Sequence, residues 1–298
     1  MSIRPVKRVS LSQSILEGAG VRLHRAFGFA DTPDFDPFLL LDDLRNDHPE
    51  DYLAGFPWHP HRGIETITYV LSGSVRHSDS LGNRGIVGPG DVQWMTAGRG
   101  VLHQEMPQGD HLGQMHGFQL WANLPASLKM TTPRYQDIQA QAIPCVTDDD
   151  GTCVRVICGS FWGKTGPIDG VPSQPRYLDV TVAPNTTKRL AVERPRHAFA
   201  YVFEGSGTFC DASEPQSVRT ESVVGLIKPV ANRSLVCFDG GDEICIRSGR
   251  SGVRFLLISG LQLNEPVAWR GPIVMNTQTE LKQAFAALQQ GTFIQDPK

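Results

Sequence analysis

The sequence predicts an all-β protein that consists of two small β-barrels and one short helix near the C-terminus. Strand-like segments recur at intervals of roughly 8–12 residues between glycine-rich turns, which is typical of sandwiches and small barrels. Residues 68–74 and 200–206 share the pattern Tyr-Val-apolar-x-Gly-Ser, which indicates that one barrel is duplicated. A chain of 298 residues also exceeds what one hydrophobic core usually serves.

The first domain is expected to span residues 1–133 and the second residues 134–298, with a proline-containing connector at 126–150. The strands expected in the first domain are, in chain order, 6–9, 21–27, 65–71, 74–79, 92–98 and 113–124. Those expected in the second are 153–158, 177–182, 198–205, 234–238, 242–246 and 253–258.

One helix is predicted over residues 279–290. Thr277 and Glu280 have the spacing of a capping box, and Gly291 stands where a C-terminal cap belongs. Apolar residues at helical spacing within it are expected to pack against a barrel.

Composition excludes several classes of protein. The formal net charge is −3 and no basic tract occurs, which argues against direct nucleic-acid binding. No apolar run approaches the roughly 18–20 residues of a membrane span, and the N-terminus lacks the apolar core of a signal peptide. We therefore expect a cytoplasmic protein that does not bind membranes, and we expect its six cysteines to be reduced.

Two short segments carry candidate metal ligands. Residues two apart on a β-strand face the same side, so His59 and His61 point together, as do His103 and Glu105. If both strands line one barrel, these four side chains converge on one point. Imidazole and carboxylate ligands suit a divalent first-row metal, and iron is one of the candidates. The alternative is a buried polar cluster, which would be costly to desolvate without a compensating cation.

Two carboxylates compete for the fourth position. Glu65 is four residues from His61, roughly 13 Å along an extended strand, whereas Glu105 pairs with His103 as His61 does with His59. We therefore choose Glu105 as the ligand and place Glu65 behind the ligands, facing the barrel interior. His77 is expected to lie away from the site. The remaining histidines of this half are interpreted as structural or exposed: His24, His48, His111 and His116.

The second barrel lacks these ligands. Upstream of its Tyr201 there is His197, and nothing replaces His103 and Glu105. It is expected to bind no metal.

Long motifs resemble those of the pirin family of the cupin superfamily. They comprise residues 57–66, 90–100, 103–105, 134–137 and 271–277. The resemblance implies two cupin-type β-barrels (a bicupin), with metal in the N-terminal barrel alone. It further implies iron, Fe(II), held by His59, His61, His103 and Glu105. Members are associated with quercetin 2,3-dioxygenase activity, and animal pirins with nuclear transcriptional co-regulation.

Three hypotheses about function follow. In the first, the protein is a dioxygenase whose substrates are a flavonol and dioxygen, and Glu105 is also the catalytic base that deprotonates the 3-hydroxyl. In the second, it is a regulator whose metal oxidation state tunes binding to a protein partner, with nuclear localisation if the source is eukaryotic. In the third, it stores or carries a metal. In each case we expect a monomer.

Overall fold

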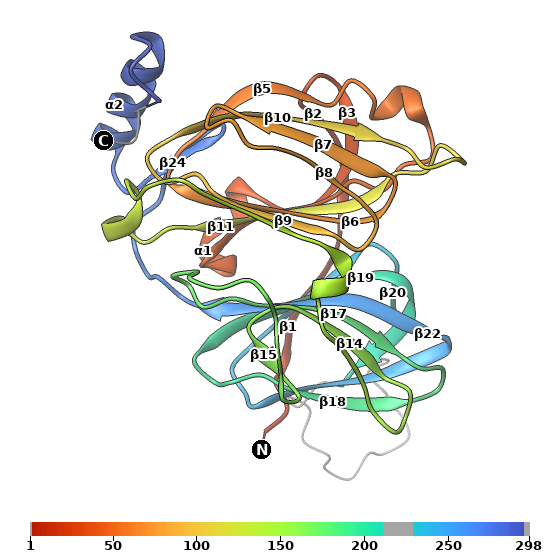
Figure 1. Ribbon diagram of the computed structural model, residues 1–298. Helices are drawn as coiled ribbons and strands as arrows, with labels where there is room; N and C mark the ends of the chain where they lie inside the picture. The colour runs from red at the N-terminus through yellow and green to blue at the C-terminus, as the bar shows by residue number, and fades with distance from the viewer. Residues whose placement is uncertain (1, 211–228, 295–298) are drawn as a thin grey trace. The chain divides into compact units, whose positions relative to one another are not determined.

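The computed structural model describes residues 2–210 and 229–294, which divide into two compact units (Figure 1). We call residues 13–142, 170–173 and 263–294 the N-terminal barrel. The described residues among 1–12, 143–169 and 174–262 form the C-terminal barrel. These units differ from the predicted domains at both chain ends, because residues before 13 join the later barrel and residues after 262 return to the earlier one.

Two antiparallel sheets form the N-terminal barrel. One contains, in spatial order, β5 (Phe56–His61), β10 (Val101–Gln108), β7 (Ser74–Asp79) and β8 (Arg84–Val87). The other contains β12 (Arg134–Ile138), β9 (Val92–Thr96), β6 (Ile64–Ser72), β11 (His116–Asn123), β4 (Phe38–Asp43), β3 (Val21–Phe27) and β2 (Gln13–Glu17). Short helical turns occupy the connections: α1 (Thr32–Phe35) and the 3-10 turns Phe29–Asp31, Pro49–Asp51, Ala126–Leu128 and Ala140–Ala142.

The interior of the N-terminal barrel is apolar at one end and polar at the other. Val21, Leu23, Val70, Val75 and Met115 are among the residues of a buried apolar cluster. Farther along the same strands, polar side chains replace the apolar ones, and this polar end holds the site described below.

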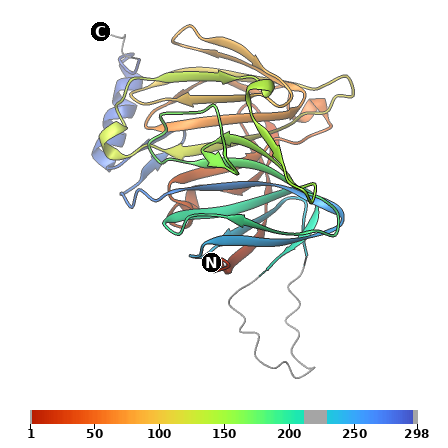
Figure 2. The ribbon, with the colours of Figure 1, turned by 60° about the horizontal axis from the view of Figure 1, so that its bottom comes forward.

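The C-terminal segment belongs to the N-terminal barrel. It contains β23 (Ala268–Arg270), β24 (Ile273–Met275) and α2 (Gln278–Gln289), and α2 lies beside the strands of this barrel (Figure 2). The predicted capping box is confirmed, since Thr277 accepts from the Glu280 amide and Glu280 accepts from the Thr277 amide. Gly291 has φ of +70°, as a C-terminal cap requires.

The strands of the C-terminal barrel are antiparallel. In spatial order they are β1 (Val6–Leu11), β21 (Ser234–Phe238), β19 (Arg196–Phe209), β22 (Glu243–Leu261), β17 (Arg176–Val182), β14 (Cys153–Cys158) and β13 (Cys145–Thr147). In addition, β18 (Thr187–Ala191) pairs with β22, and β20 (Val230–Ala231) pairs with β19. β15 (Ser160–Phe161) and β16 (Lys164–Thr165) form a separate ribbon. The predicted strands 242–246 and 253–258 form one continuous strand, β22. The apolar interior of this barrel includes Val156, Leu178, Ala200 and Leu257.

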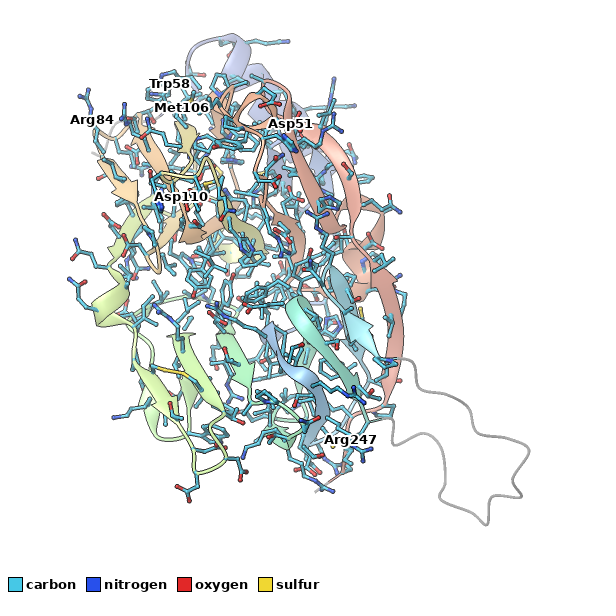
Figure 3. All side chains as sticks on the ribbon, turned by 90° about the vertical axis from the view of Figure 1, so that its right-hand side faces the viewer. Asp51, Trp58, Arg84, Met106, Asp110 and Arg247 are labelled. Carbon is cyan, nitrogen blue, oxygen red and sulfur yellow. A yellow bond between two sulfur atoms is a disulfide. The ribbon has the colours of Figure 1, made fainter. Side chains whose placement is uncertain are left out.

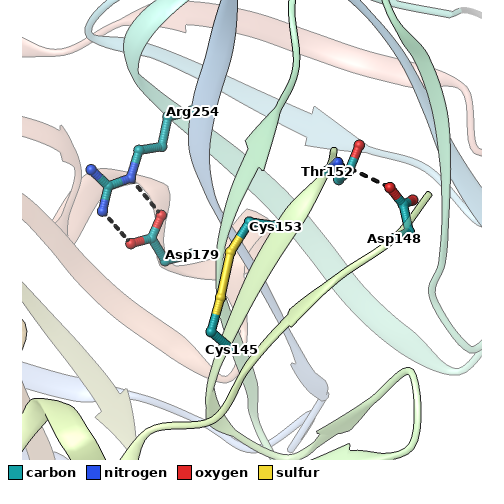
Figure 4. Close-up of a disulfide and its surroundings, with 6 residues drawn as sticks. All are labelled: Cys145, Asp148, Thr152, Cys153, Asp179 and Arg254. Atoms are coloured by element: carbon teal, nitrogen blue, oxygen red, sulfur yellow. Dashed lines mark hydrogen bonds and ion pairs between the residues drawn. A yellow bond between two sulfur atoms is a disulfide. The ribbon is translucent and has the colours of Figure 1, made fainter. Parts of the chain in front are cut away.

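The prediction that all cysteines are reduced is wrong at one pair. Cys145 and Cys153 form a disulfide with Cα atoms 6.6 Å apart (Figure 4). They lie on the paired strands β13 and β14, which a tight turn connects. In that turn, the Asp148 carboxylate accepts from the Thr152 amide at 2.9 Å. The turn brings together two cysteines that are eight residues apart in sequence.

Among the described residues, none of the helices combines the length and the apolar character that crossing a membrane requires.

Candidate metal centre

Three histidines meet at the polar end of the N-terminal barrel. β5 and β10 run antiparallel with His103 opposite His59, while His61 lies opposite Val101. The ring centroids lie 4.3 to 4.8 Å apart, and one ligand atom from each ring lies within 4.8 Å of the others. The alternation along β10 leaves Met106 half-buried on the other face of the strand, and Trp58 on β5 is exposed; both are labelled in Figure 3. The strand spacing thus brings together the imidazoles that the sequence predicted.

Hydrogen bonds orient two of the rings. The Nδ1 atom of His59 lies 2.8 Å from the Pro57 carbonyl oxygen, and that of His61 lies 3.0 Å from the Pro272 carbonyl oxygen. Because a carbonyl only accepts, each Nδ1 carries the proton. The Nε2 atoms are then bare and lie 3.1 Å apart. Two lone pairs facing each other at this distance favour a cation between them.

The third ring, that of His103, is fully buried, and neither of its nitrogens has a hydrogen-bond partner among the described residues. Burial lowers the pKa of His103 well below its usual value, and the neighbouring His61 and His59 lower it further. Burial likewise lowers the pKa of His61, with a smaller effect from His59. Neutral imidazoles are the form that binds metals. The donor set therefore fits a divalent first-row metal ion.

Glu105 lies on the wall of the same cavity as His59 and His61, but it is not part of the three-histidine group. Its carboxylate accepts hydrogen bonds from the Thr68 hydroxyl at 2.8 Å and from the Gln119 amide at 3.0 and 3.1 Å. These donors fix the orientation of the carboxylate beside the imidazoles. Coordination by Glu105 stays a prediction.

The predicted placement of Glu65 inside the barrel is wrong. Thr68 contacts Glu105, so the even-numbered residues of β6 face the interior and Glu65 faces away. Instead, Glu65 accepts from the Thr96 hydroxyl at 2.8 Å, and burial raises its pKa to about 7. The parity argument failed because Gly63, with φ of +77°, turns the chain between β5 and β6, which belong to different sheets.

His77 lies closer to the site than expected. Its buried ring has its centroid 5.3 Å from that of His103. Its Nδ1 is 2.8 Å from the Gln93 amide nitrogen, and its Nε2 is 3.5 Å from Asp79. Sequence reasoning missed Gln93 and Gln119. Both lie opposite Thr68 on neighbouring strands, so strand pairing would have located them.

A cavity of about 620 Å³ opens onto the histidines. Aromatic side chains contribute much of its wall, namely Phe29, Phe56, Trp121 and Trp269. Arg25 also lines it and donates two hydrogen bonds of 2.8 Å to the Asp42 carboxylate. Burial raises the pKa of Asp42 to about 6, although the Arg25 contact opposes that shift. The cavity can accept a flat aromatic ligand with polar groups at its rim.

Comparisons with known proteins agree with this fold. Residues 20–122 match the family Pirin, and residues 177–294 match the Pirin C-terminal cupin domain. A pirin-like protein of Caulobacter vibrioides is 42% identical over 98% of this chain and 100% of its own. A pirin-like protein of Solanum lycopersicum is 39% identical over 96% and 91%. The crystal structure of a quercetin 2,3-dioxygenase from Acinetobacter baumannii, 29% identical, covers 98% of this chain and 99% of its own with a TM-score of 0.85. The chain belongs to the pirin family.

Proposed function

We propose that this protein is a metal-dependent dioxygenase that cleaves a flavonol such as quercetin. The observation that carries the proposal is a set of three converging imidazoles, two of them buried and that of His59 half-buried, with an oriented carboxylate beside them, at an aromatic-lined cavity. The relationship to a quercetin 2,3-dioxygenase supports the same substrate class. The cavity volume of about 620 Å³ lies within the range of sites that bind small organic ligands such as a flavonol.

His59, His61, His103 and Glu105 would hold the metal, for which we propose Fe(II). When bound, such an ion supplies a Lewis acid and positions at which a substrate oxygen and dioxygen can bind. The chain's own residues bind and orient the flavonol. Trp121 and Trp269, whose ring centroids lie 5.9 Å apart, form an aromatic wall for its flat rings.

Glu105 would also receive the proton of the flavonol 3-hydroxyl. The Thr68 hydroxyl and the Gln119 amide hold its carboxylate, so this base needs little reorganisation to accept the proton. Gln119 donates to both carboxylate oxygens and lines the cavity itself. Gln119 is therefore proposed as the residue that orients Glu105.

Dioxygen consumption tests the proposal. Protein loaded anaerobically with Fe(II) and then mixed with quercetin in air should consume dioxygen stoichiometrically with loss of the flavonol. His59→Ala should abolish the reaction, and His48→Ala, a change at an exposed histidine of the same barrel, should leave it unchanged. Wild-type turnover no greater than that of His59→Ala would refute the dioxygenase assignment. Elemental analysis of Glu105→Gln and Glu65→Gln would show which glutamate binds the metal. We expect that only Glu105→Gln loses metal.

A further inference from the structure

The C-terminal segment, residues 263–294, makes direct contact with the strand end that carries His61. We propose that this segment is a positioning element of the metal centre: it fixes the tautomer and orientation of His61. The inference rests on the proposed metal site, but its tests do not all require bound metal.

The first contact is the one made to the histidine itself. The Pro272 carbonyl oxygen accepts from Nδ1 of His61 at 3.0 Å, which leaves Nε2 as the metal-binding atom. The Pro272 carbonyl belongs to a residue 211 positions after His61 in the chain. The orientation of this ligand is therefore set from outside its own sheet.

The residues after His61 hold the segment in place. Arg62 donates to the Phe293 carbonyl at 2.9 Å, and its guanidinium lies 4.1 Å from the centroid of the Phe293 ring. The Val274 amide donates to the Arg62 carbonyl at 3.1 Å. Arg62 also donates to the Arg99 carbonyl at 2.6 Å. A single buried side chain thus links both halves of the histidine motif to the C-terminal segment.

Lys129 provides a second link. Its buried ammonium donates to the Gly63 carbonyl at 2.8 Å, to the Asn123 amide oxygen at 2.5 Å and to the Val274 carbonyl at 3.0 Å. An ammonium group has three N–H donors, and all three are used here. Lys129 therefore joins the bend after His61 to β24.

Two glycines of the motif provide the space for this contact. A Cβ on Gly63 would collide with the Val274 carbonyl oxygen. A Cβ on Gly100 would lie 2.9 Å from the Phe293 carbonyl oxygen. Both glycines also have positive φ, so a side chain there is strained for two reasons. The motif is shaped to receive the C-terminal segment as well as to present ligands.

The tautomer of His61 is the most direct test. In 15N-labelled metal-free protein, two-dimensional NMR of the imidazole rings should find His61 protonated at Nδ1, with slow exchange of that proton. Protonation at Nε2 would overturn the inference. This result is independent of metal binding and of activity, so it distinguishes failure of the inference from failure of the proposed function.

Metal affinity provides the second test. Lys129→Met keeps the aliphatic stem and removes the three hydrogen bonds. Cobalt(II) binding, followed by visible absorption and chelator competition, should weaken by a few-fold, because Lys129 holds β24 and acts on His61 only through the Pro272 carbonyl. The absorption spectrum should also change. Lys282→Met, on the exposed face of α2, should match wild type in both measurements.

Unchanged affinity and spectrum in a folded Lys129→Met protein would overturn the inference. If that variant does not fold, Arg62→Lys takes its place, because it retains the charge and loses the fork that spans Arg99 and Phe293. Wild-type behaviour of Arg62→Lys would contradict the proposal equally. If wild-type protein binds no cobalt(II), the metal site itself fails, and the NMR measurement still decides the role of the segment.

Discussion

The two barrels share a strand pattern and differ in what fills it. Tyr69 and Tyr201 are both buried, and Gly73 and Gly205 both have positive φ at the same place in the repeat. The repeat aligns Thr68 with Ala200. Thr68 donates to Glu105, whereas Ala200 lies within the buried apolar cluster of the C-terminal barrel. The strand scaffold is thus compatible with either interior, and a few side chains decide whether it can hold a metal.

A polar interior needs hydrogen-bond or charge partners that an apolar interior does not need. His61, His103 and Glu105 are removed from water, and this desolvation is unfavourable unless each group finds a partner. Thr68, Gln119 and two proline carbonyls supply part of that compensation. We infer that a bound cation supplies the rest.

The largest expected effect is the loss of catalysis when Glu105 is made neutral. Glu105→Gln keeps the shape of the side chain but removes both the base and a proposed metal ligand, so kcat for dioxygen consumption should fall by about 100-fold or more. Glu204→Gln changes an exposed carboxylate of the C-terminal barrel and should leave kcat unchanged. Equal kcat values for Glu105→Gln and wild type would show that Glu105 is not the catalytic base.

A smaller effect is expected at Glu65, which is buried on the other face of β6. Its pKa is raised from 4.5 to about 7 in the folded chain, so the folded state retains a proton that the unfolded state releases. The free energy of unfolding should therefore decrease as the pH rises from about 4.5 to about 7. Glu65→Gln should remove roughly 2 kcal/mol of that decrease, measured by urea unfolding at pH 5 and pH 8. An identical pH dependence in the variant would show that Glu65 is ionised throughout this range.

The smallest effect is expected from exchanging the residues that the repeat aligns. Ala200→Thr places a hydroxyl among buried apolar side chains and should lower the free energy of unfolding by about 1–2 kcal/mol. Thr68→Ala removes the hydrogen bond to Glu105 and should weaken cobalt(II) binding by a few-fold, with little change in stability. Equilibrium unfolding and metal titration of both variants check this. If Ala200→Thr leaves the free energy of unfolding unchanged, the interiors of the two barrels differ less in polarity than their side chains indicate.

Strand spacing was sufficient to predict the histidine cluster, because His59, His61 and His103 lie on neighbouring antiparallel strands. The helix was equally predictable, since Thr277 and Glu280 cap it through local contacts alone. The spacing of residues within one strand or one helical turn determines these features, so the sequence pattern alone predicts them.

Properties that depend on distant pairing were not predictable in this way. The role of Gln119 follows from the register of β11 against β6, and the contact of Pro272 with His61 joins residues 211 positions apart. Glu65 was misplaced because one glycine turn between two sheets reversed the parity of the next strand. The predicted domain boundaries also differ from the two units at the chain ends, where residues before 13 belong to the C-terminal barrel and residues after 262 to the N-terminal barrel. No local sequence pattern marks which barrel a terminal strand joins.

Metal content tests the central claim most directly. Wild-type protein loaded anaerobically with Fe(II) and desalted should retain about one ion per chain by mass spectrometry, because three preformed imidazoles converge in the N-terminal barrel. His103→Ala should retain almost none, and His197→Ala, in the C-terminal barrel, should match wild type. Full metal content in His103→Ala, or its loss in His197→Ala, would contradict the account.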